Sequence, residues 1–134
     1  ADWTVNYRTQ PDWEKAALEF TGGEGVDAVL EVGGAGTLAR SLKAARYGGT
    51  VGVIGVLGGI DASLSIGQVQ AKNLVLRGVY VGSRADFVVM NRFLEGSGIR
   101  PVIDRVFPFD EVPAALAYME EGRHFGKVAI RLYS

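Results

Sequence analysis

Apolar residues in this chain fall into short runs that alternate with glycine-rich turns and with segments of helical spacing. The runs at 26–32, 50–56 and 74–82 predict strands, and their near-continuous apolar character is typical of parallel strands covered on both faces. Between the first two runs, residues 37–46 predict a helix, whereas residues 57–73 predict mostly loop. This alternation predicts an α/β fold with a mainly parallel sheet.

Two segments extend this pattern on either side of the central runs. Residues 3–7 alternate between apolar and polar positions and predict a strand, and residues 12–20 predict a helix that two glycines end. After the third apolar run, Phe87, Met90 and Leu94 form one stripe at helical spacing and predict another helix. In a sheet of this kind ligands bind beyond the carboxyl ends of the strands, so the loops that follow the apolar runs are the candidate binding positions.

The last third of the chain predicts a short extended piece, in which Pro108 disfavours a central strand, then a helix and a final strand. Residues 105–109 predict a short extended piece, Asp110 is a plausible N-cap for the following helix, and residues 127–132 predict a final strand. The length of 134 residues is that of one domain and is sufficient to bury a core.

Composition narrows the classes of function. Hydrophobic residues make up 48% and charged residues 22% of the chain, which favours a globular fold. The formal net charge of −1 gives no electrostatic reason to bind nucleic acid or an anionic membrane. The chain has no cysteine, which excludes disulfides, thiolate metal sites and a nucleophilic cysteine, and a cytoplasmic location is expected.

The turn after the first apolar run is the strongest candidate site. From Gly34 to Ala39 it reads G-x-G-x-x-A, a nominal dinucleotide fingerprint, in which backbone N–H groups could approach a pyrophosphate. A tight strand-to-helix turn explains the same glycines. The fingerprint also requires an acidic residue at the end of the next strand, and residues 53–56 contain none. This departure disfavours the pyrophosphate role and leaves contact with another part of a nucleotide open.

Few titratable side chains suggest catalysis. Glu31 lies inside a predicted strand and is interpreted as a hydrogen-bonded structural acid rather than a functional one. His124, the only histidine, follows a predicted helix, where a general acid or base role is disfavoured. Tyr7 and Arg8 end the first predicted strand, where a ring and a guanidinium could bind an adenine or a phosphate, although a solvated strand end is equally ordinary.

Several motifs in order resemble the carboxyl half of the medium-chain dehydrogenase/reductases, with zinc-type alcohol dehydrogenases and quinone oxidoreductase-like proteins as the nearest members. The motifs are VNYRT at 5–9, GGEGVDAVLEVGG at 22–34, TLARSLKAARYGGTVGVIGVLGG at 37–59, LRGVYVGSR at 76–84 and HFGKVAIR at 124–131. The resemblance implies a partial Rossmann fold that lacks its first two strands, and a catalytic domain outside this chain. The 134 residues would be one domain, with the Rossmann part at about 1–100 and a segment returning to the catalytic domain at about 101–134.

The resemblance also implies a cofactor and residues that contact it. The whole protein would transfer hydride between NAD(P), with NADP slightly preferred, and an alcohol, aldehyde or quinone-like substrate, and it could hold zinc, for which this chain has no ligands. Residues near the cofactor would be Tyr7 and Arg8 on the adenosine side, Gly33 and Gly34 at the nicotinamide ribose, Ile54, Gly55, Val56, Tyr80, Val81 and Gly82 around the nicotinamide, and Lys127 in a recurrent Gly-Lys step. No catalytic or metal-binding residue is expected among them.

Assembly and activity follow from the same resemblance. The strand at 74–81 is expected at the edge of the sheet, where it would pair with a second copy in a homodimer. The segment at 3–7 would lack its neighbouring strand, so we expect it frayed, re-paired or exchanged between chains. The chain alone is expected to be inactive and to bind the dinucleotide weakly. The alternative interpretation is a non-catalytic α/β module that binds a nucleotide or a protein partner.

Overall fold

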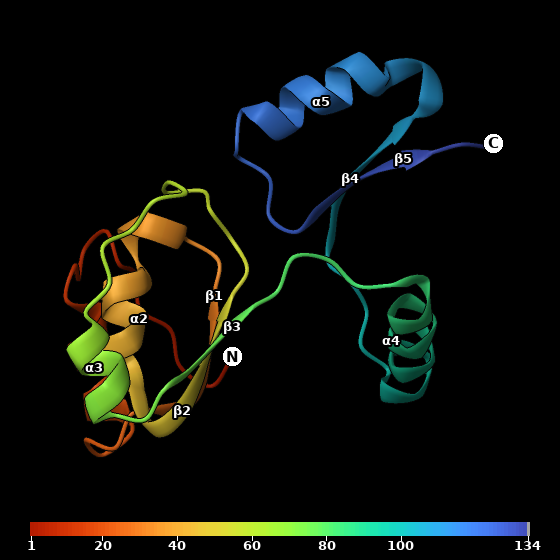
Figure 1. Cartoon of the computed structure of the whole chain (residues 1–134). Coiled ribbons are helices and arrows are strands. Elements are labelled where there is room, and N and C mark those ends of the chain that lie inside the picture. Colours follow the sequence, from red (N-terminus) through yellow and green to blue (C-terminus); the bar gives the residue numbers. More distant parts are fainter. Residues whose placement is uncertain (134) are drawn as a thin grey trace. The chain divides into compact units, whose positions relative to one another are not determined.

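The structure is a computed structural model that describes residues 1–133. The chain forms two compact units, one comprising Ala1–Val81 and the other beginning at Gly82, and each is described by itself (Figure 1). The predicted α/β class is confirmed, because both units contain parallel strands with flanking helices. The expected organisation as one domain, with parts at about 1–100 and 101–134, stays a prediction.

A parallel sheet forms the centre of the first unit. Strands β1 (Val26–Glu31), β2 (Ala45–Val53) and β3 (Val75–Gly78) lie in the order β1-β2-β3, which is also their order in the chain. β-branched residues dominate the pairing, and Val29 of β1 lies opposite Val51 of β2. Strand β3 lies at an edge of the sheet, as the sequence predicts.

Helices cover one face of this sheet. Helices α1 (Trp13–Phe20), α2 (Leu38–Ala44) and α3 (Ile66–Ala71) belong to this unit, and α2 packs on β1, β2 and both other helices. The core lies between α2, α3 and the sheet and consists of Leu42, Ala45, Val51 and Leu74. On the other face the side chain of Leu30 is 75% exposed, although the apolar run predicts cover on both faces. Within residues 1–81 the helices that contact the sheet pack on the face that carries Val29 and Val51.

The strands differ in extent from the sequence predictions. Strand β2 begins at Ala45, so the preceding helix ends at Ala44 rather than at 46, because the chain there already pairs with β1. It also ends at Val53 rather than at 56, because the next two backbone N–H groups both donate to the carbonyl of Glu31. The predicted loop at 57–73 contains α3, which the sequence analysis missed because its apolar pattern is only about one and a half turns long.

The segment at 3–7 forms no strand, so that prediction is wrong. Residues 1–6 have no regular secondary structure, and a turn follows them. No strand within the described residues lies alongside to accept its hydrogen bonds, and β propensity alone does not form a sheet. Within the described residues the segment does not re-pair with another strand, and its exchange between chains stays a prediction. The Trp3 ring stacks on Phe20 of α1 with the ring centroids 5.2 Å apart, which holds the segment against the first unit.

The second unit contains a parallel pair of strands, β4 (Ile103–Pro108) and β5 (Lys127–Arg131). Helix α5 (Val112–Glu120) connects the two strands and packs on both. A 3₁₀ turn at Phe109–Glu111 precedes α5. Asp110 therefore lies inside this turn and is not the N-cap, because the turn delays the start of the α-helix and moves the cap position to Glu111.

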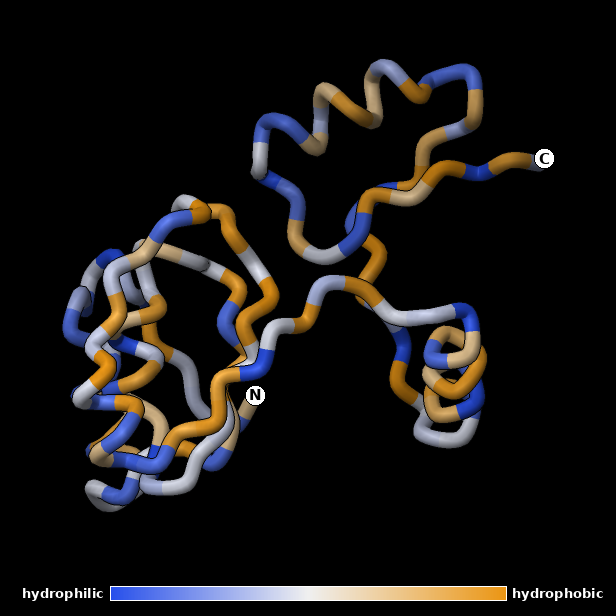
Figure 2. The backbone as a smooth tube through the Cα atoms, in the orientation of Figure 1, coloured by the Kyte–Doolittle hydropathy of each residue, from blue (hydrophilic) through white to orange (hydrophobic). Residues whose placement is uncertain are grey.

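Helix α4 (Arg84–Ser97) is the first helix of the second unit, and capping interactions define both of its ends. The side chain of Ser83 accepts from the N–H of Asp86 and the Asp86 carboxylate accepts from the N–H of Ser83, which is a capping box. Gly98 ends the helix in the left-handed conformation. None of the α4 side chains is buried, and its apolar residues are visible along the helix in Figure 2.

Candidate functional site

The loops that follow β1 and β2 are joined by backbone hydrogen bonds at the carboxyl end of the sheet. The N–H of Gly58 donates to the carbonyl of Gly33 at 2.7 Å, and the N–H of Ala35 donates to the carbonyl of Gly59 at 3.3 Å. Together with the N–H of Gly55, which donates to the carbonyl of Glu31 at 3.0 Å, these bonds hold the two loops side by side. The edge of the sheet at which a ligand is predicted to bind is therefore formed mainly by backbone atoms of these two loops. We call these joined loops the backbone platform.

Glycine is required where these loops approach each other. Gly34 has a φ of +80°, and a Cβ there would lie 2.9 Å from the carbonyl oxygen of Gly59 and from the Cα of Val56. A Cβ on Gly55 would overlap the carbonyl group of Val32. Any larger residue at these two positions would separate the loops.

The carboxylate of Glu31 lies beneath the glycine-rich turn and accepts hydrogen bonds from it. The N–H groups of Gly33 and Gly34 donate to its Oε1 at 2.9 Å each, and the Thr37 hydroxyl donates to the same atom at 2.5 Å. The Ser41 hydroxyl donates to Oε2. The expectation that the Glu31 carboxylate is hydrogen-bonded within its own chain is confirmed.

The ionisation of Glu31 follows from two opposing effects. The residue is only 3% exposed, and burial by itself would raise its pKa. The hydrogen bonds from Ser41, Thr37, Gly34 and Gly33 outweigh burial and hold the pKa of Glu31 below its usual value. Glu31 is therefore a carboxylate at neutral pH, fully engaged with donors of its own chain.

This arrangement favours one of the two interpretations of the G-x-G-x-x-A turn. In a phosphate-binding turn the backbone N–H groups point at the ligand. Here the N–H groups of Gly33 and Gly34 donate to Glu31 instead. The two N–H groups at the start of the turn are thus engaged by Glu31, which favours a tight strand-to-helix connection over a pyrophosphate site.

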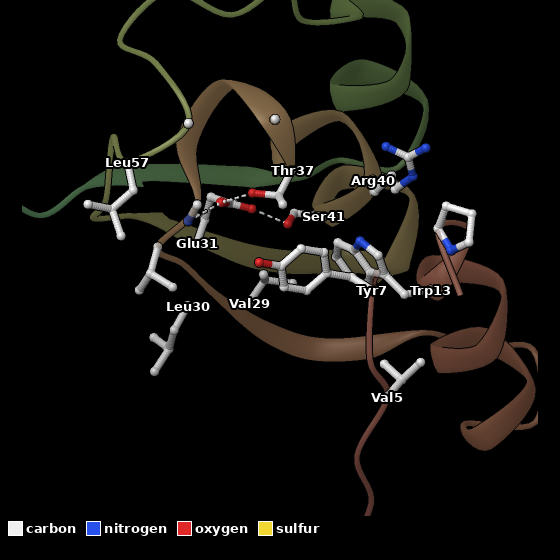
Figure 3. Close-up of a pocket in the computed structure, with 15 residues that line it drawn as sticks. Val5, Tyr7, Trp13, Val29, Leu30, Glu31, Thr37, Arg40, Ser41 and Leu57 are labelled. Atoms are coloured by element: carbon white, nitrogen blue, oxygen red, sulfur yellow. Dashed lines mark hydrogen bonds between the residues drawn. The ribbon is translucent and has the colours of Figure 1, made fainter. Parts of the chain in front are cut away.

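A pocket of about 770 Å³ lies beside β1 and is shown in Figure 3. Apolar and aromatic side chains form most of its wall, with polar groups from the first turns of α2. The lining residues that carry the argument below are Tyr7, Trp13, Val29, Thr37, Arg40 and Leu57. Its volume lies within the range of small-molecule sites, about 300–1,000 Å³.

The pocket is lined by two charged residues, Glu31 and Arg40, and the guanidinium of Arg40 is paired with a further buried carboxylate. Glu14 of α1 is 4% exposed, and its Oε2 lies 3.3 Å from Nε of Arg40 in α2. Lys43, one turn further along α2, has its Nζ 3.8 Å from Oε1 of the same Glu14. This ion pair fixes Arg40 at the junction of the two helices, while 38% of the arginine side chain stays exposed to a ligand.

The structure brings some of the predicted site residues together and separates others. Tyr7 lines the pocket with Gly33, whereas Arg8 is exposed and does not line it. Gly34 lies in the turn, and Ile54, Gly55 and Val56 follow β2 in the joined loops. Tyr80 and Val81 follow β3 and are exposed, at 95% and 78%. Gly82 and Lys127 belong to the second unit, and Lys127 begins β5. The roles of all these residues in binding stay predictions.

Several pocket residues were missed by the sequence analysis, among them Trp13, Thr37 and Arg40. Trp13 was placed only on the apolar stripe of its helix, and Thr37 and Arg40 were not considered. Thr37 and Arg40 lie at the start of a helix that follows a glycine-rich turn, and this position is the sequence signal that could have identified them. The contact of Arg40 with Glu14 joins residues 26 positions apart and has no local signal.

His124 belongs to a polar cluster of the second unit. Asp104 accepts from the Tyr118 hydroxyl at 2.8 Å and from the N–H of Phe125 at 3.1 Å, and the N–H and the hydroxyl lower the pKa of Asp104. The rings of Tyr118 and His124 are 6.2 Å apart. The cluster ties β4 to α5 and to the loop before β5.

Metal-ligating side chains do not gather in the part of the chain that the structure describes. Among residues 1–133 no group of three or more Asp, Glu or His side chains could hold a metal ion. None of the helices in the same range has the length and apolar composition to cross a membrane.

Comparison with known proteins gives consistent matches over nearly the whole chain. The family model described as zinc-binding dehydrogenase matches residues 1–130. A zinc-type alcohol dehydrogenase-like protein of Schizosaccharomyces pombe is 38% identical over 98% of this chain and 39% of its own length. A quinone oxidoreductase-like protein 2 of Bos taurus is 28% identical over 98% of this chain and 40% of its own length.

Solved structures agree with these sequence matches. A crystal structure titled as an alcohol dehydrogenase of Sinorhizobium meliloti has a TM-score of 0.84 at 38% identity, over 93% of this chain and 36% of that chain. A structure titled as an NAD-dependent alcohol dehydrogenase has a TM-score of 0.86 at 33% identity, over 99% of this chain and 38% of that one. The chain thus spans about two fifths of the length of the curated relatives described above.

Proposed function

This chain belongs to the zinc-binding dehydrogenase family, and from that premise we propose that it supplies most of the cofactor-binding part of an NAD(P)-dependent oxidoreductase. The observation that carries the proposal is the backbone platform of joined loops next to the pocket, at the carboxyl end of a parallel sheet. This edge is where α/β sheets bind nucleotides.

The residues of the pocket fit the adenosine side of a dinucleotide. The rings of Tyr7 and Trp13 can stack on a purine, and the guanidinium of Arg40 can bind a ribose phosphate. The charge of Arg40 supports a phosphate-bearing form such as NADP, in agreement with the slight preference that the resemblance implies. The glycine-rich turn does not fit the pyrophosphate, because Glu31 occupies its donors.

The strand ends fit the uncharged nicotinamide side. We assign Gly33 and Gly34 to the nicotinamide ribose, and Ile54, Gly55, Val56, Tyr80, Val81 and Gly82 to the nicotinamide. At the platform the glycines let backbone approach the ligand closely, while the aliphatic side chains exclude water from it.

The bound cofactor supplies the hydride chemistry, and the residues of this chain bind and orient it. Alcohols, aldehydes and quinone-like compounds are the substrates that fit the family. Zinc does not fit the donors present in residues 1–133, so no step is assigned to a metal here. Turnover by these 134 residues alone is not expected.

The test is NMR titration of the chain with NADH and NADPH, which detects dissociation constants in the millimolar range. We expect shifts of the Trp13 indole and of the amides of Gly33 and Gly36. Tyr7→Leu should weaken binding about fivefold through the lost stacking. Tyr47→Leu, which removes an exposed ring that does not line the pocket, is the matched control. The expected dissociation constant is on the order of 1 mM, so the cofactor is added to about 10 mM. If the signals of these residues do not shift at that concentration, the assignment is refuted.

We further propose a homodimer through strand β3 and the residues up to 81. The strand lies at the edge of the sheet, and Val75 on it is exposed. Val75→Lys should convert a dimer to a monomer in light scattering, because a charged edge opposes strand pairing. Ile60→Lys, at another exposed apolar position of the same unit, should leave the mass unchanged. A wild-type chain that is monomeric at high concentration would contradict the dimer.

A further inference from the structure

The carboxylate of Glu31 lies where the donors of the glycine-rich turn converge. Its two oxygens accept from two successive backbone N–H groups and two hydroxyls, which belong to Gly33, Gly34, Thr37 and Ser41. Glu31 comes from the end of β1, so the negative charge that fills the turn is part of the same chain. Glu31 is almost completely buried, and so are Gly34 and Ser41 among its donors, whereas Gly33 and Thr37 are half-buried.

The same set of donors is of the kind that binds phosphate in other proteins. Successive N–H groups of a turn, combined with hydroxyls, make a concave site that favours an anion. In this chain a carboxylate takes the place that a phosphate oxygen pair would take, and the hydrogen bonds keep it ionised by lowering its pKa. A second anion at the turn would meet both the negative charge and the lack of free donors.

We propose that Glu31 is a specificity-determining residue that excludes phosphate and other anions from the Gly33–Gly34 turn. The turn then accepts only uncharged parts of a ligand, such as a ribose or a ring. For a dinucleotide, this means that the pyrophosphate is directed away from the turn. That consequence rests on the proposed function, whereas the exclusion of anions does not.

A purely structural role for Glu31 makes a different prediction. If the carboxylate only stabilises the turn, its removal lowers stability and creates no new binding. If it excludes anions, its removal exposes two N–H groups and two hydroxyls that a phosphate can use. The exclusion therefore predicts a gain of phosphate binding in a variant without the carboxylate.

The experiment measures the unfolding midpoint of wild type, Glu31→Ala and Glu31→Gln in increasing inorganic phosphate, with sodium chloride used to hold ionic strength constant. A ligand that binds only the folded state raises the folded-to-unfolded ratio about tenfold at ten times its dissociation constant. We expect this rise in Glu31→Ala and not in wild type. Phosphate also stabilises proteins by exclusion from their surface, and the wild-type curve measures that general effect.

Glu31→Gln keeps an amide oxygen that can accept from Gly33 and Gly34, so the turn stays filled and the phosphate response should match that of wild type. In the Glu31→Ala background, the additional change Ser41→Ala removes one of the freed donors and should reduce the response severalfold. The measurement of stability against phosphate concentration applies even if Glu31→Ala is mostly unfolded in chloride, because phosphate that binds the folded state would then restore folding.

A Glu31→Ala chain whose stability responds to phosphate no more than wild type overturns the proposal, as does one that stays unfolded at all phosphate concentrations. Failure of the proposed function is seen separately, because the titration with NADH and NADPH uses the wild-type chain and a different readout. Phosphate-dependent stabilisation of Glu31→Ala alone would support the exclusion even if the wild-type chain bound neither dinucleotide.

Discussion

The two units of this chain contain similar elements but differ in how much of them is buried. In the first unit, Leu42, Ala45 and Val51 are fully enclosed between the helices and the sheet. In the second unit, Phe107 and Ala115 are the buried hydrophobic residues among those described, and α4 contributes none. The three-stranded sheet gives its helices a surface to cover, whereas the pair of strands in the second unit supports only α5.

The difference shows that a helix whose ends are defined by capping residues need not bury an apolar face against the rest of its unit. Helix α4 has a capping box at Ser83 and a left-handed glycine at Gly98, so its ends follow from local sequence. Helix α2 has no side-chain cap, yet it carries Leu42, the largest fully buried side chain of the chain's described part. Most helical stability in proteins comes from packing of an apolar face, which α2 has and α4 lacks within its unit.

The largest expected effect comes from truncating the core of the first unit. Leu42→Ala should lower the free energy of unfolding by about 3 kcal/mol, because it leaves a cavity where the side chain is fully buried. Leu116→Ala in α5, where the side chain is 54% exposed, should cost less than about 1 kcal/mol. Urea unfolding followed by circular dichroism measures both. Equal losses would show that the second unit has a core comparable to that of the first.

An intermediate effect is expected from the acidic residues, one in each unit. Glu31 has a lowered pKa in the folded chain, so its stabilising contribution is present above the pKa of an unfolded glutamate, about 4.3, and is lost as the pH falls through the folded-state value. Glu31→Gln should remove this loss at acidic pH and should cost about 2 kcal/mol at neutral pH.

Asp104 of the second unit provides the comparison for Glu31. Its pKa is also lowered, by the N–H of Phe125 and the hydroxyl of Tyr118, but the residue is exposed. Asp104→Asn should therefore change the pH dependence of unfolding in the same direction but less than Glu31→Gln. Thermal unfolding between pH 7 and pH 3 measures both variants. A larger change for Asp104→Asn would contradict the importance of burial.

The smallest effect is expected from the cap of α4. Ser83→Ala should cost about 1 kcal/mol of helix stability and speed amide exchange in α4, because one half of the capping box is lost. Exchange in β1, β2 and β3 should be unchanged. Ser97→Ala is the comparison at the other end of the helix, where it removes two hydrogen bonds of 3.3 Å, one donated to the carbonyl of Leu94 and one accepted from the N–H of Ile99. Faster exchange in the strands would show that α4 stabilises the first unit.

The sequence by itself determined the elements that have strong local patterns. The apolar runs around Val29, Val51 and Leu76 predicted the strands and their parallel class, because such runs are typical of parallel strands, although the predicted cover on both faces is not found at Leu30. The lack of an acid after β2 disfavoured a pyrophosphate role for the glycine-rich turn, and the hydrogen bonds of Glu31 agree with that interpretation.

Tertiary structure decided the features that depend on contacts between distant residues. Residues 3–7 have strand propensity but form no strand, since a strand needs a neighbour for its backbone hydrogen bonds. Arg40 lines the pocket and pairs with Glu14 of another helix, a contact between residues distant in the sequence. Burial also depends on contacts between distant residues. The apolar stripe of α4 correctly predicts a helix, but it does not specify which element covers the stripe. Local sequence sets backbone preference, whereas burial and charge pairing depend on which elements meet in space.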